Sequence, residues 1–244
     1  MSDVLTNTRK FHLKPFSLYH HRSSMKVGMD ALLLGAWTDP GNSRRILDIG
    51  TGCGILSLML AAKCYANITA LDIDHESAKE SEENFNLSAY HNRLEVKEED
   101  FNSFCAACAE KFDLVISNPP FFINDQHSAS QRKARARHSS SLTYDQLLKG
   151  AGKILSENGK LSVVLPYEEG NLFLKTASDE FGLYLSRQML IFPRRGLTPN
   201  RLNLELSRKP VNKSVSEKFV IREEEGQFTA AYKKLLDDFL IGIS

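Results

Sequence analysis

The sequence predicts an α/β fold in which helices cover both faces of a mostly parallel, seven-stranded sheet. Short apolar runs with strand character alternate with segments that have helical spacing, a pattern typical of βαβ units. Two further runs near the carboxyl terminus alternate apolar and polar residues, which indicates an antiparallel pair. The predicted parallel strands are 44–50, 67–74, 94–100, 112–117 and 160–166, and the antiparallel pair is 183–192 with 201–207.

The first strands and helices follow from local pattern. RRILDIG (44–50) is an apolar run that ends in glycine, and LSLMLAAKC (56–64) places apolar residues at helical spacing. NITALDID (67–74) is a second apolar run, and the segment 75–89 after it predicts a charged helix. LEVKEED (94–100) predicts a short third strand.

The carboxyl-terminal half continues the alternation. Segment 141–159 has apolar residues at helical spacing and ends in Asn158 and Gly159, which together are a helix stop signal. The other elements expected here are strands at 112–117 and 160–166, a helix near 170–182 and a terminal helix at 229–240.

Length and composition favour one domain. With 244 residues and 42% hydrophobic content, the chain can bury a substantial core. We expect residues 1–40 to form an amino-terminal extension that packs on the cofactor and substrate side of a single domain at 41–244. No run approaches the roughly 18 apolar residues of a membrane span, and the amino terminus lacks the apolar centre of a secretory signal. These features predict a cytoplasmic protein, and we expect a monomer.

The cysteines do not predict a metal site. Cys53 and Cys64 lie in apolar patterns. Cys105 and Cys108 form a single CxxC, without a second cysteine or histidine pair at zinc spacing. Two small residues on an alanine-rich helical turn account for this CxxC.

Charge is unevenly distributed, although the net charge is only +1. Residues 72–100 are strongly acidic, whereas three other stretches are basic. Because the basic stretches lie outside the expected core, together they favour a nucleic-acid surface. They are the amino-terminal segment (Arg9, Lys10, Lys14, Arg22 and Lys26), QRKARARH (131–138) and FPRRGLTPNR (192–201).

The first candidate binding motif is the glycine turn in LDIGTGCGILSL (47–58). Gly50, Gly52 and Gly54 fall between a strand and a helix, where absent side chains let backbone amides approach a ligand. The dinucleotide fingerprint G-x-G-x-x-G/A would put its third small residue at Ile55, so the spacing disfavours NAD. Asp48 is expected either to hydrogen-bond the loop or to meet a ligand's ammonium group.

Acidic residues close the next two strands. A carboxylate about 20 residues past the glycines is placed to accept both hydroxyls of an adenosine ribose, which makes Asp72 the candidate. Asp74 is then expected to cap the following helix. Asp100 suits an adenine amino group, or is a plain loop acid. Ile73, beside Asp72, and Phe101, after Asp100, complete the candidate cofactor-binding residues.

The strand at 112–117 runs into the unusual turn SNPPFF (117–122). In order and approximate spacing, LDIGTGCG, ALDID, EED and this turn resemble the class I S-adenosylmethionine-dependent methyltransferases, in the branch whose fourth motif reads (D/N/S)PP(Y/F). This resemblance covers residues 25–166. Segments 10–37 and 134–148 further resemble the bacterial enzymes that methylate adenine N6 at position 37 of a valine tRNA. The resemblance implies a Rossmann-like class I fold, S-adenosylmethionine as cofactor and tRNA as partner.

The same turn suggests a catalytic role. An exocyclic amine on an aromatic ring is a poor nucleophile, because its lone pair is delocalised into the ring. The side-chain carbonyl of Asn118, which also borders the cofactor, and the main-chain carbonyl of Pro119 can accept both amine protons, while Pro119 and Pro120 stiffen the turn. Phe121 can stack on a flipped-out base, with Phe122 behind it. The basic residues expected to contact tRNA are Arg132, Lys133, Arg135, Arg137, Arg194, Arg195 and Arg201.

Other interpretations stay open. The same turn serves protein glutamine amides and guanine N2 of ribosomal RNA, because all of these substrates present a planar NH2 group. Glutamine methyltransferases share an amino-terminal helical domain longer than this extension, and an inactive RNA-binding subunit would have lost one of the motifs. Lys26 and Asp30 lie in the segment that folds over the cofactor in the resembled family. His138 is expected to be a polar loop residue rather than a catalytic one.

Overall fold

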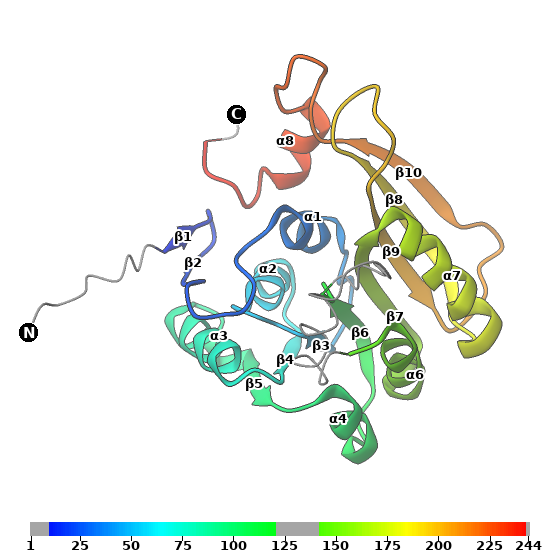
Figure 1. Cartoon of the computed structure of the whole chain (residues 1–244). Helices are drawn as coiled ribbons and strands as arrows, with labels where there is room; N and C mark the ends of the chain where they lie inside the picture. Colours follow the sequence, from blue (N-terminus) through cyan, green and yellow to red (C-terminus); the bar gives the residue numbers. More distant parts are fainter. Residues whose placement is uncertain (1–9, 121–141, 243–244) are drawn as a thin grey trace, which may run out of the picture.

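The computed structural model describes residues 10–120 and 142–242, and Figure 1 shows how the elements are arranged. In chain order they are β1 (Phe11–His12), β2 (Ser17–Leu18), α1 (Met29–Trp37), β3 (Arg45–Ile49), α2 (Ile55–Lys63), β4 (Asn67–Asp72), α3 (His75–Leu87), the 3₁₀ turn η1 (His91–Arg93), β5 (Leu94–Glu98), α4 (Phe101–Ala107), β6 (Phe112–Ser117), α6 (Tyr144–Ile154), β7 (Leu155–Pro166), α7 (Tyr167–Phe181), β8 (Tyr184–Phe192), β9 (Arg201–Ser207), β10 (Val215–Val220) and α8 (Ala230–Leu236).

A single large sheet organises the domain. Its strands lie in the order β10-β8-β9-β7-β6-β3-β4-β5, and β9 runs antiparallel to both of its neighbours (Figure 1). The predicted α/β class, the mostly parallel sheet and the antiparallel pair are therefore confirmed. β10 pairs in parallel with β8, so the sheet in the described part of the chain has eight strands rather than the predicted seven. The sequence pattern did not predict β10, because only Phe219 of this strand is buried.

Alternating side chains of the strands enter two cores, one on each face of the sheet. In β3, Ile46 joins the core formed with α1, α2, α3 and α8, whereas Leu47 joins the core formed with α4, α6 and α7. The strands of a parallel sheet are buried on both faces, which explains the nearly continuous apolar runs of the sequence. Helices on both faces were predicted and are observed (Figure 1).

The predicted helix at 141–159 was wrong at its carboxyl end. α6 ends at Ile154 and β7 begins at Leu155, so the chain enters the sheet earlier than the expected position 160. Leu155 pairs with Phe112 and Lys160 with Leu114, which leaves the residues between them as a bulge within the strand. A Cβ at Gly159 would lie 2.7 Å from the Phe112 carbonyl oxygen. This glycine therefore permits a close strand contact and does not stop a helix.

The amino-terminal segment is tied to the domain at several points. Lys14 forms an ion pair with Asp237 at 3.0 Å, and its amide donates to the Phe239 carbonyl at 2.8 Å. α1 packs in the first core against α2 and α8, with Leu33 and Leu34 almost fully buried. The extension expected at 1–40 thus contributes a core helix.

Strands β3 to β6 bring their carboxyl ends to one edge of the sheet. Ile49 of β3 pairs with Leu71 of β4 on one side and with Ser117 of β6 on the other. The chain runs outward from β3 to β4 and β5 and then returns to the other side of β3, so the β3–β6 boundary is a topological switch point. Ligands of such sheets bind outside the carboxyl ends of the strands at this point.

Candidate active site

The glycine turn has a backbone shape that favours glycine. Gly50, Gly52 and Gly54 have φ values of +68°, +57° and +84°, all in the left-handed region. A Cβ at Gly54 would lie 2.5 Å from the Phe85 ring, so this glycine also permits close packing against α3. A Cβ at Gly50 would meet no described atom within 4 Å, and one at Gly52 would meet only the Met25 carbonyl oxygen, at 4.0 Å. The turn is therefore packed at Gly54 and open at Gly50 and Gly52.

Asp48 is fully buried, and only one of its oxygens is used. Oδ2 accepts hydrogen bonds from Thr51 Oγ1 and Ser57 Oγ, both at 2.7 Å, and from the Ser57 amide at 3.2 Å. Oδ1 has no donor within the described ranges. Burial raises the pKa of Asp48 to about 6, against the lowering effect of the Thr51 and Ser57 hydrogen bonds. The carboxylate thus holds the loop through one oxygen, and the other oxygen stays buried without a donor among the described residues.

Asp72 ends β4 directly beside the glycine turn. Its Oδ2 accepts from the Gly52 amide at 2.8 Å, and its Oδ1 accepts from the Asp74 amide at 3.0 Å. Burial raises the pKa of Asp72, while these two hydrogen bonds lower it. Asp74 caps α3 by accepting from the Ser77 amide, which confirms its predicted role. Ile73 is 49% exposed, so an apolar surface lies next to the Asp72 carboxylate.

Asp100 and Phe101 begin a helix. Asp100 is the N-cap of α4 and accepts from the Ser103 amide through Oδ1 at 3.0 Å. Phe101 is 4% exposed, and its ring packs so closely on α6 that a Cβ at Gly150 would lie 2.3 Å from it. The cap leaves the second oxygen of Asp100 for a ligand, whereas the Phe101 ring belongs to the core.

The SNPPFF turn follows β6 at the switch point. Ser117 donates its hydroxyl to the Ile49 carbonyl at 2.8 Å, which fixes the start of the turn to β3. Asn118 is half-buried, and its Oδ1 is buried with no hydrogen-bond donor among the described residues. Pro119 is buried and Pro120 is exposed. The predicted site residues outside the described residues are Phe121, Phe122, Arg132, Lys133, Arg135 and Arg137, and His138 lies there too.

The sheet brings three of these positions together. Gly50, Asp72 and Asn118 each stand at or directly after a strand end, on neighbouring strands in which Ile49 pairs with Leu71 and with Ser117. Adjacent strands lie about 4.8 Å apart, so the positions span about two strand spacings. A ligand lying across the glycine turn would therefore reach both the Asp72 side and the Asn118 side.

Comparison with known proteins assigns the family. The profile described as "Methyltransferase small domain" matches residues 25–172, from the segment before α1 into α7. The chain belongs to this family. The methyltransferase small domain match thus includes the glycine turn, Asp72 and the Asn118 turn.

Relatives of this methyltransferase match it along almost its whole length. The chain is 36% identical to a protein of Bacteroides thetaiotaomicron named tRNA1(Val) (adenine(37)-N6)-methyltransferase, over 95% of this chain and 97% of the relative. It is 38% identical to a protein of the same name from Tolumonas auensis, over 96% of this chain and 98% of the relative. The crystal structure of Atu636 from Agrobacterium tumefaciens, described as a predicted O-methyltransferase, matches with a TM-score of 0.67 at 22% identity. That match covers 86% of this chain and 96% of the other, and it supports the fold.

Two buried polar residues of the methyltransferase, Glu80 and Asn84, were not singled out from the sequence. Both side chains are fully buried in α3, and both bind the backbone of a segment that we call the strap, residues 19–25. Their spacing in the sequence could have identified them. Both lie on the helix side that carries Phe85, where a surface helix normally buries apolar residues.

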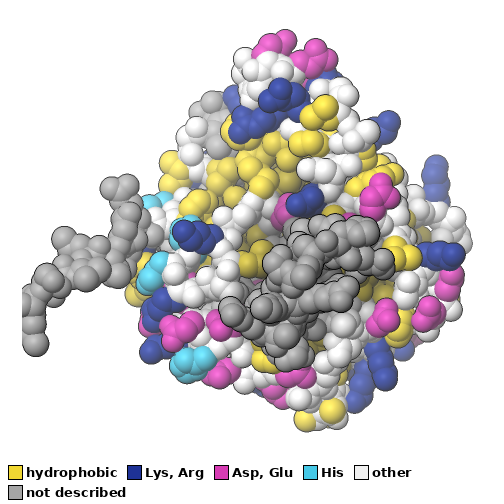
Figure 2. Space-filling view, viewed as in Figure 1, with side chains coloured by type: hydrophobic (Ala, Val, Ile, Leu, Met, Phe, Trp, Pro, Cys, Tyr) yellow, Lys and Arg dark blue, Asp and Glu magenta, His cyan; other side chains and the backbone are white. Residues whose placement is uncertain are grey.

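Of the arginines predicted to contact tRNA, the three within the described residues differ in their partners. Arg195 pairs with Glu223 at 2.6 Å, and Arg201 pairs with Asp30 at 3.1 Å, linking β9 to α1. Arg194 is exposed and forms no ion pair with any residue that the structure describes. Figure 2 shows hydrophobic side chains gathered around α1 and α8 on this face, with Lys and Arg side chains scattered around them.

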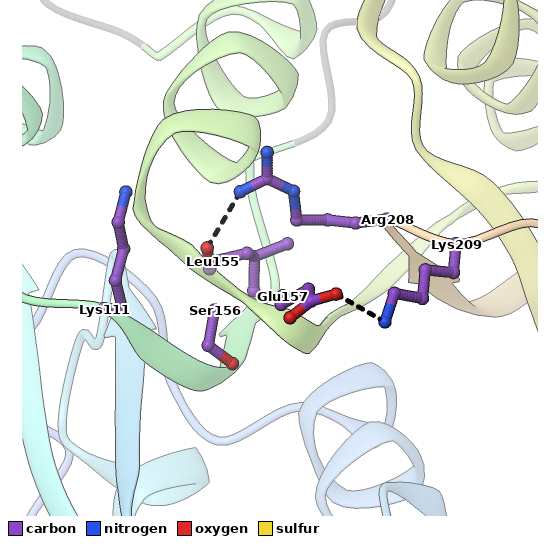
Figure 3. Close-up of a pocket in the computed structure, with 6 residues that line it drawn as sticks. All are labelled: Lys111, Leu155, Ser156, Glu157, Arg208 and Lys209. Atoms are coloured by element: carbon purple, nitrogen blue, oxygen red, sulfur yellow. Dashed lines mark hydrogen bonds and ion pairs between the residues drawn. The ribbon is translucent and has the colours of Figure 1, made fainter.

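A separate hollow of about 360 Å³ lies at the opposite edge of the sheet (Figure 3). Its charged groups already have partners: Arg208 donates to the Leu155 carbonyl at 3.0 Å, and Lys209 pairs with Glu157 at 2.8 Å. The hollow lies at the beginnings of β6 and β7, away from the strand ends that carry the motifs. Its lining residues are Lys111, Leu155, Ser156, Glu157, Arg208 and Lys209.

Residues 10–120 and 142–242 contain no group of three or more His, Cys, Asp or Glu side chains that could hold a metal ion. In the same ranges, no helix has the length and apolar character required to cross a membrane.

Proposed function

We propose that this protein transfers a methyl group from S-adenosylmethionine to the exocyclic N6 amine of adenine 37 in the anticodon loop of a valine tRNA. The similarity to relatives of that name, which extends over nearly the full length of both chains, carries this proposal. The buried oxygen of Asn118, which has no donor within residues 10–120 and 142–242, supports an amine as the acceptor. We also propose that the protein acts on tRNA in the cytoplasm and is a monomer.

The residues at the switch point fit the proposed cofactor. Space beside Gly50 and Gly52 admits a ligand against the backbone, and Oδ1 of Asp48, which has no donor among the described residues, can meet an ammonium group. We assign the ribose hydroxyls to Asp72 and the adenine amino group to the second oxygen of Asp100. When bound, S-adenosylmethionine supplies a methyl group on a positively charged sulfur, which is already electrophilic. The proposed chemistry therefore requires no metal.

The Asn118 turn supplies the acceptors that the substrate amine needs. Asn118 Oδ1 and the Pro119 carbonyl would each accept one proton of the amine, holding its lone pair out of conjugation with the ring. With S-adenosylmethionine bound, the amine nitrogen would bond to the methyl carbon as the carbon–sulfur bond breaks, and the methylated amine would release one proton to water. Because no strong base is involved, positioning supplies most of the rate enhancement. Phe121 is proposed to stack on the flipped-out base.

Two other substrates and one non-enzymatic role are alternatives. A guanine N2 amine or a glutamine amide presents the same planar NH2 group, but the full-length similarity is to relatives named for adenine. A subunit that binds RNA without catalysis would not need the Asn118 acceptor, and this residue is present with its oxygen unpaired by any residue that the structure describes.

Methylation of defined tRNA tests the proposal. Purified protein is incubated with methyl-labelled S-adenosylmethionine and a valine tRNA transcript, and nucleosides are identified by mass spectrometry. We expect N6-methyladenosine in the transcript, and none when adenine 37 is replaced by guanine. Label in a guanosine, in a protein glutamine or in no acceptor would overturn the proposal.

A further inference from the structure

The carboxylate of Glu80 binds three consecutive amides of the strap. Oε1 accepts from the amides of His21 and Arg22, both at 2.9 Å, and Oε2 accepts from the Ser23 amide at 2.8 Å. The ring nitrogen Nδ1 of His21 lies 3.2 Å from Oε1. Burial alone would raise the pKa of Glu80, but the hydrogen bonds from Arg22, Ser23 and His21 lower it overall. The carboxylate is therefore held ionised in a cup of backbone amides.

Asn84, one turn further along α3, joins the strap to the glycine turn. Its Oδ1 accepts from the Tyr19 amide at 2.7 Å, and its Nδ2 donates to the Tyr19 carbonyl at 2.8 Å. The same Nδ2 donates to the Cys53 carbonyl at 2.8 Å. Cys53 lies between Gly52 and Gly54, so a single buried amide contacts both the strap and the turn.

Ser77 extends this contact toward the cofactor acid. Its Oγ accepts from the Ser24 amide at 3.3 Å and donates to Asp74 at 2.8 Å. Asp74 in turn donates its own amide to Asp72 at 3.0 Å. One face of α3 binds the strap from Tyr19 to Ser24. The three residues that do so lie at positions i, i+3 and i+7 of the helix, namely Ser77, Glu80 and Asn84.

The end of the strap lies beside Gly52 of the glycine turn. The Met25 carbonyl oxygen would be 4.0 Å from a Cβ at Gly52, and the Ser23 hydroxyl donates to that same oxygen at 2.9 Å. Packing alone does not require a buried glutamate and a buried asparagine here, since apolar residues fill helix faces at lower cost. Directed hydrogen bonds to backbone instead fix where the strap lies.

We propose that Glu80 and Asn84 are positioning residues for the cofactor, holding the strap against the glycine turn so that both together form one wall of the binding site. This inference rests on the proposed function in taking S-adenosylmethionine as the ligand. Neither side chain touches the ligand in this arrangement. Each acts through the strap and the turn.

The test compares Glu80→Gln with Glu82→Gln, an exposed position on the same helix. Glutamine keeps the shape of Glu80 but places an NH2 group against amide donors. We expect the dissociation constant for S-adenosylmethionine, measured by calorimetry, to rise about tenfold for Glu80→Gln. The KM for tRNA and the kcat at saturating cofactor should stay within about twofold of wild type. Hydrogen exchange of amides 21–23 should accelerate, and Glu82→Gln should change none of these quantities.

Ser77→Ala is the milder second variant, in case Glu80→Gln does not fold. It should raise the same dissociation constant about threefold and accelerate exchange at residue 24. Wild-type cofactor affinity in a variant whose strap amides have lost protection would overturn the inference, as would unchanged protection. If wild-type protein binds the cofactor but does not methylate the tRNA, the proposed function fails and the affinity comparison still decides this inference.

Discussion

The side-chain carbonyl oxygen of Asn118 is buried, and the described part of the chain offers it no hydrogen-bond donor. Leaving such a group unpaired costs about 1 to 3 kcal/mol, so a folded protein rarely keeps one without a use. Ser117 anchors the turn to β3, and Pro119 is buried. The acceptor is therefore fixed in place before any substrate arrives.

Replacing Asn118 with alanine should affect the chemical step. We expect the single-turnover rate of methyl transfer to fall by at least about 100-fold, as for the loss of one preorganised hydrogen-bonding group. Cofactor affinity measured by calorimetry should stay within about threefold, because the glycine turn and Asp72 are unchanged. Asp72→Asn should give the reverse pattern, with weakened cofactor binding. Near-normal turnover of the Asn118 variant would remove its catalytic assignment.

The raised pKa of Asp48 predicts that cofactor binding depends on pH. Its pKa of about 6 means that the buried carboxylate becomes protonated below that pH and then offers no charge to an ammonium group. Affinity for S-adenosylhomocysteine, which carries the same ammonium group, should fall by up to about tenfold per pH unit below pH 6. Calorimetry between pH 5 and 8 measures this change, and Asp48→Asn should abolish it. A wild-type affinity independent of pH would contradict the assignment.

The stability of the unliganded protein should change with pH in the opposite sense. Because the pKa of Asp48 is raised from 3.8 to about 6 on folding, the folded state holds more protons than the unfolded chain between these values. The contribution of Asp48 is therefore favourable at low pH and is lost as the pH rises through this window, by at most about 1.4 kcal/mol per pH unit. Urea unfolding of wild type and Asp48→Asn across the window isolates this contribution.

At the scale of elements, the glycine turn and α3 form one unit. Gly54 lets the turn approach α3, where Phe85 fills the space that a side chain would need. Asn84 of the same helix holds the Cys53 carbonyl. α3 follows β4, and its contacts fix the position of the glycine turn that follows β3. This helix therefore connects the ends of β3 and β4 that carry the site.

Replacing Gly54 with alanine tests this packing. Gly54 and Gly41 both have positive φ, so alanine strains either position by about 1 to 2 kcal/mol. At Gly41 a Cβ meets no described atom within 4 Å, whereas at Gly54 it would lie 2.5 Å from the buried Phe85 ring. Gly54→Ala should therefore lose about 1 to 3 kcal/mol more than Gly41→Ala in urea unfolding. Equal losses would show that the turn is not packed against α3.

At the scale of the whole molecule, the basic residues are less available than their number suggests. Lys14 pairs with Asp237, Arg22 with Glu83 and Arg195 with Glu223, so several cations of the basic stretches serve the fold. Arg194 stays exposed in the loop after β8, at the edge that also carries the glycine turn. A surface that binds tRNA must rely on such exposed cations.

Arg194 and Arg195 therefore form a matched pair for a test of tRNA binding. Arg194→Ala should weaken tRNA binding and reduce the slope of log affinity against log salt by about 1, because one phosphate contact is lost. Arg195→Ala should change the slope less, because Glu223 already neutralises this guanidinium. Filter binding at several salt concentrations measures both slopes. An unchanged slope for Arg194→Ala would place this residue outside the interface.

Local features were predicted well where they depend on neighbours in sequence. The strand at 112–117 has the predicted bounds, and Asp74 caps α3 as expected. Features that depend on pairing were missed. The first four residues of β10 are exposed, and Gly159 resembled a helix stop although it permits contact with Phe112. Glu80 and Asn84 were missed for the same reason, because their partners lie about 60 residues away along the chain.

The sequence by itself determined the α/β class, the order of the strands along the chain and the motifs that end them, because apolar periodicity and glycine spacing act over short distances. Only the tertiary structure decided that Gly50, Asp72 and Asn118 meet at one switch point, that the strap lies beside the turn, and which arginines are already paired. Those facts depend on strand register and on hydrogen bonds between distant segments. Such contacts form only when the whole chain is folded.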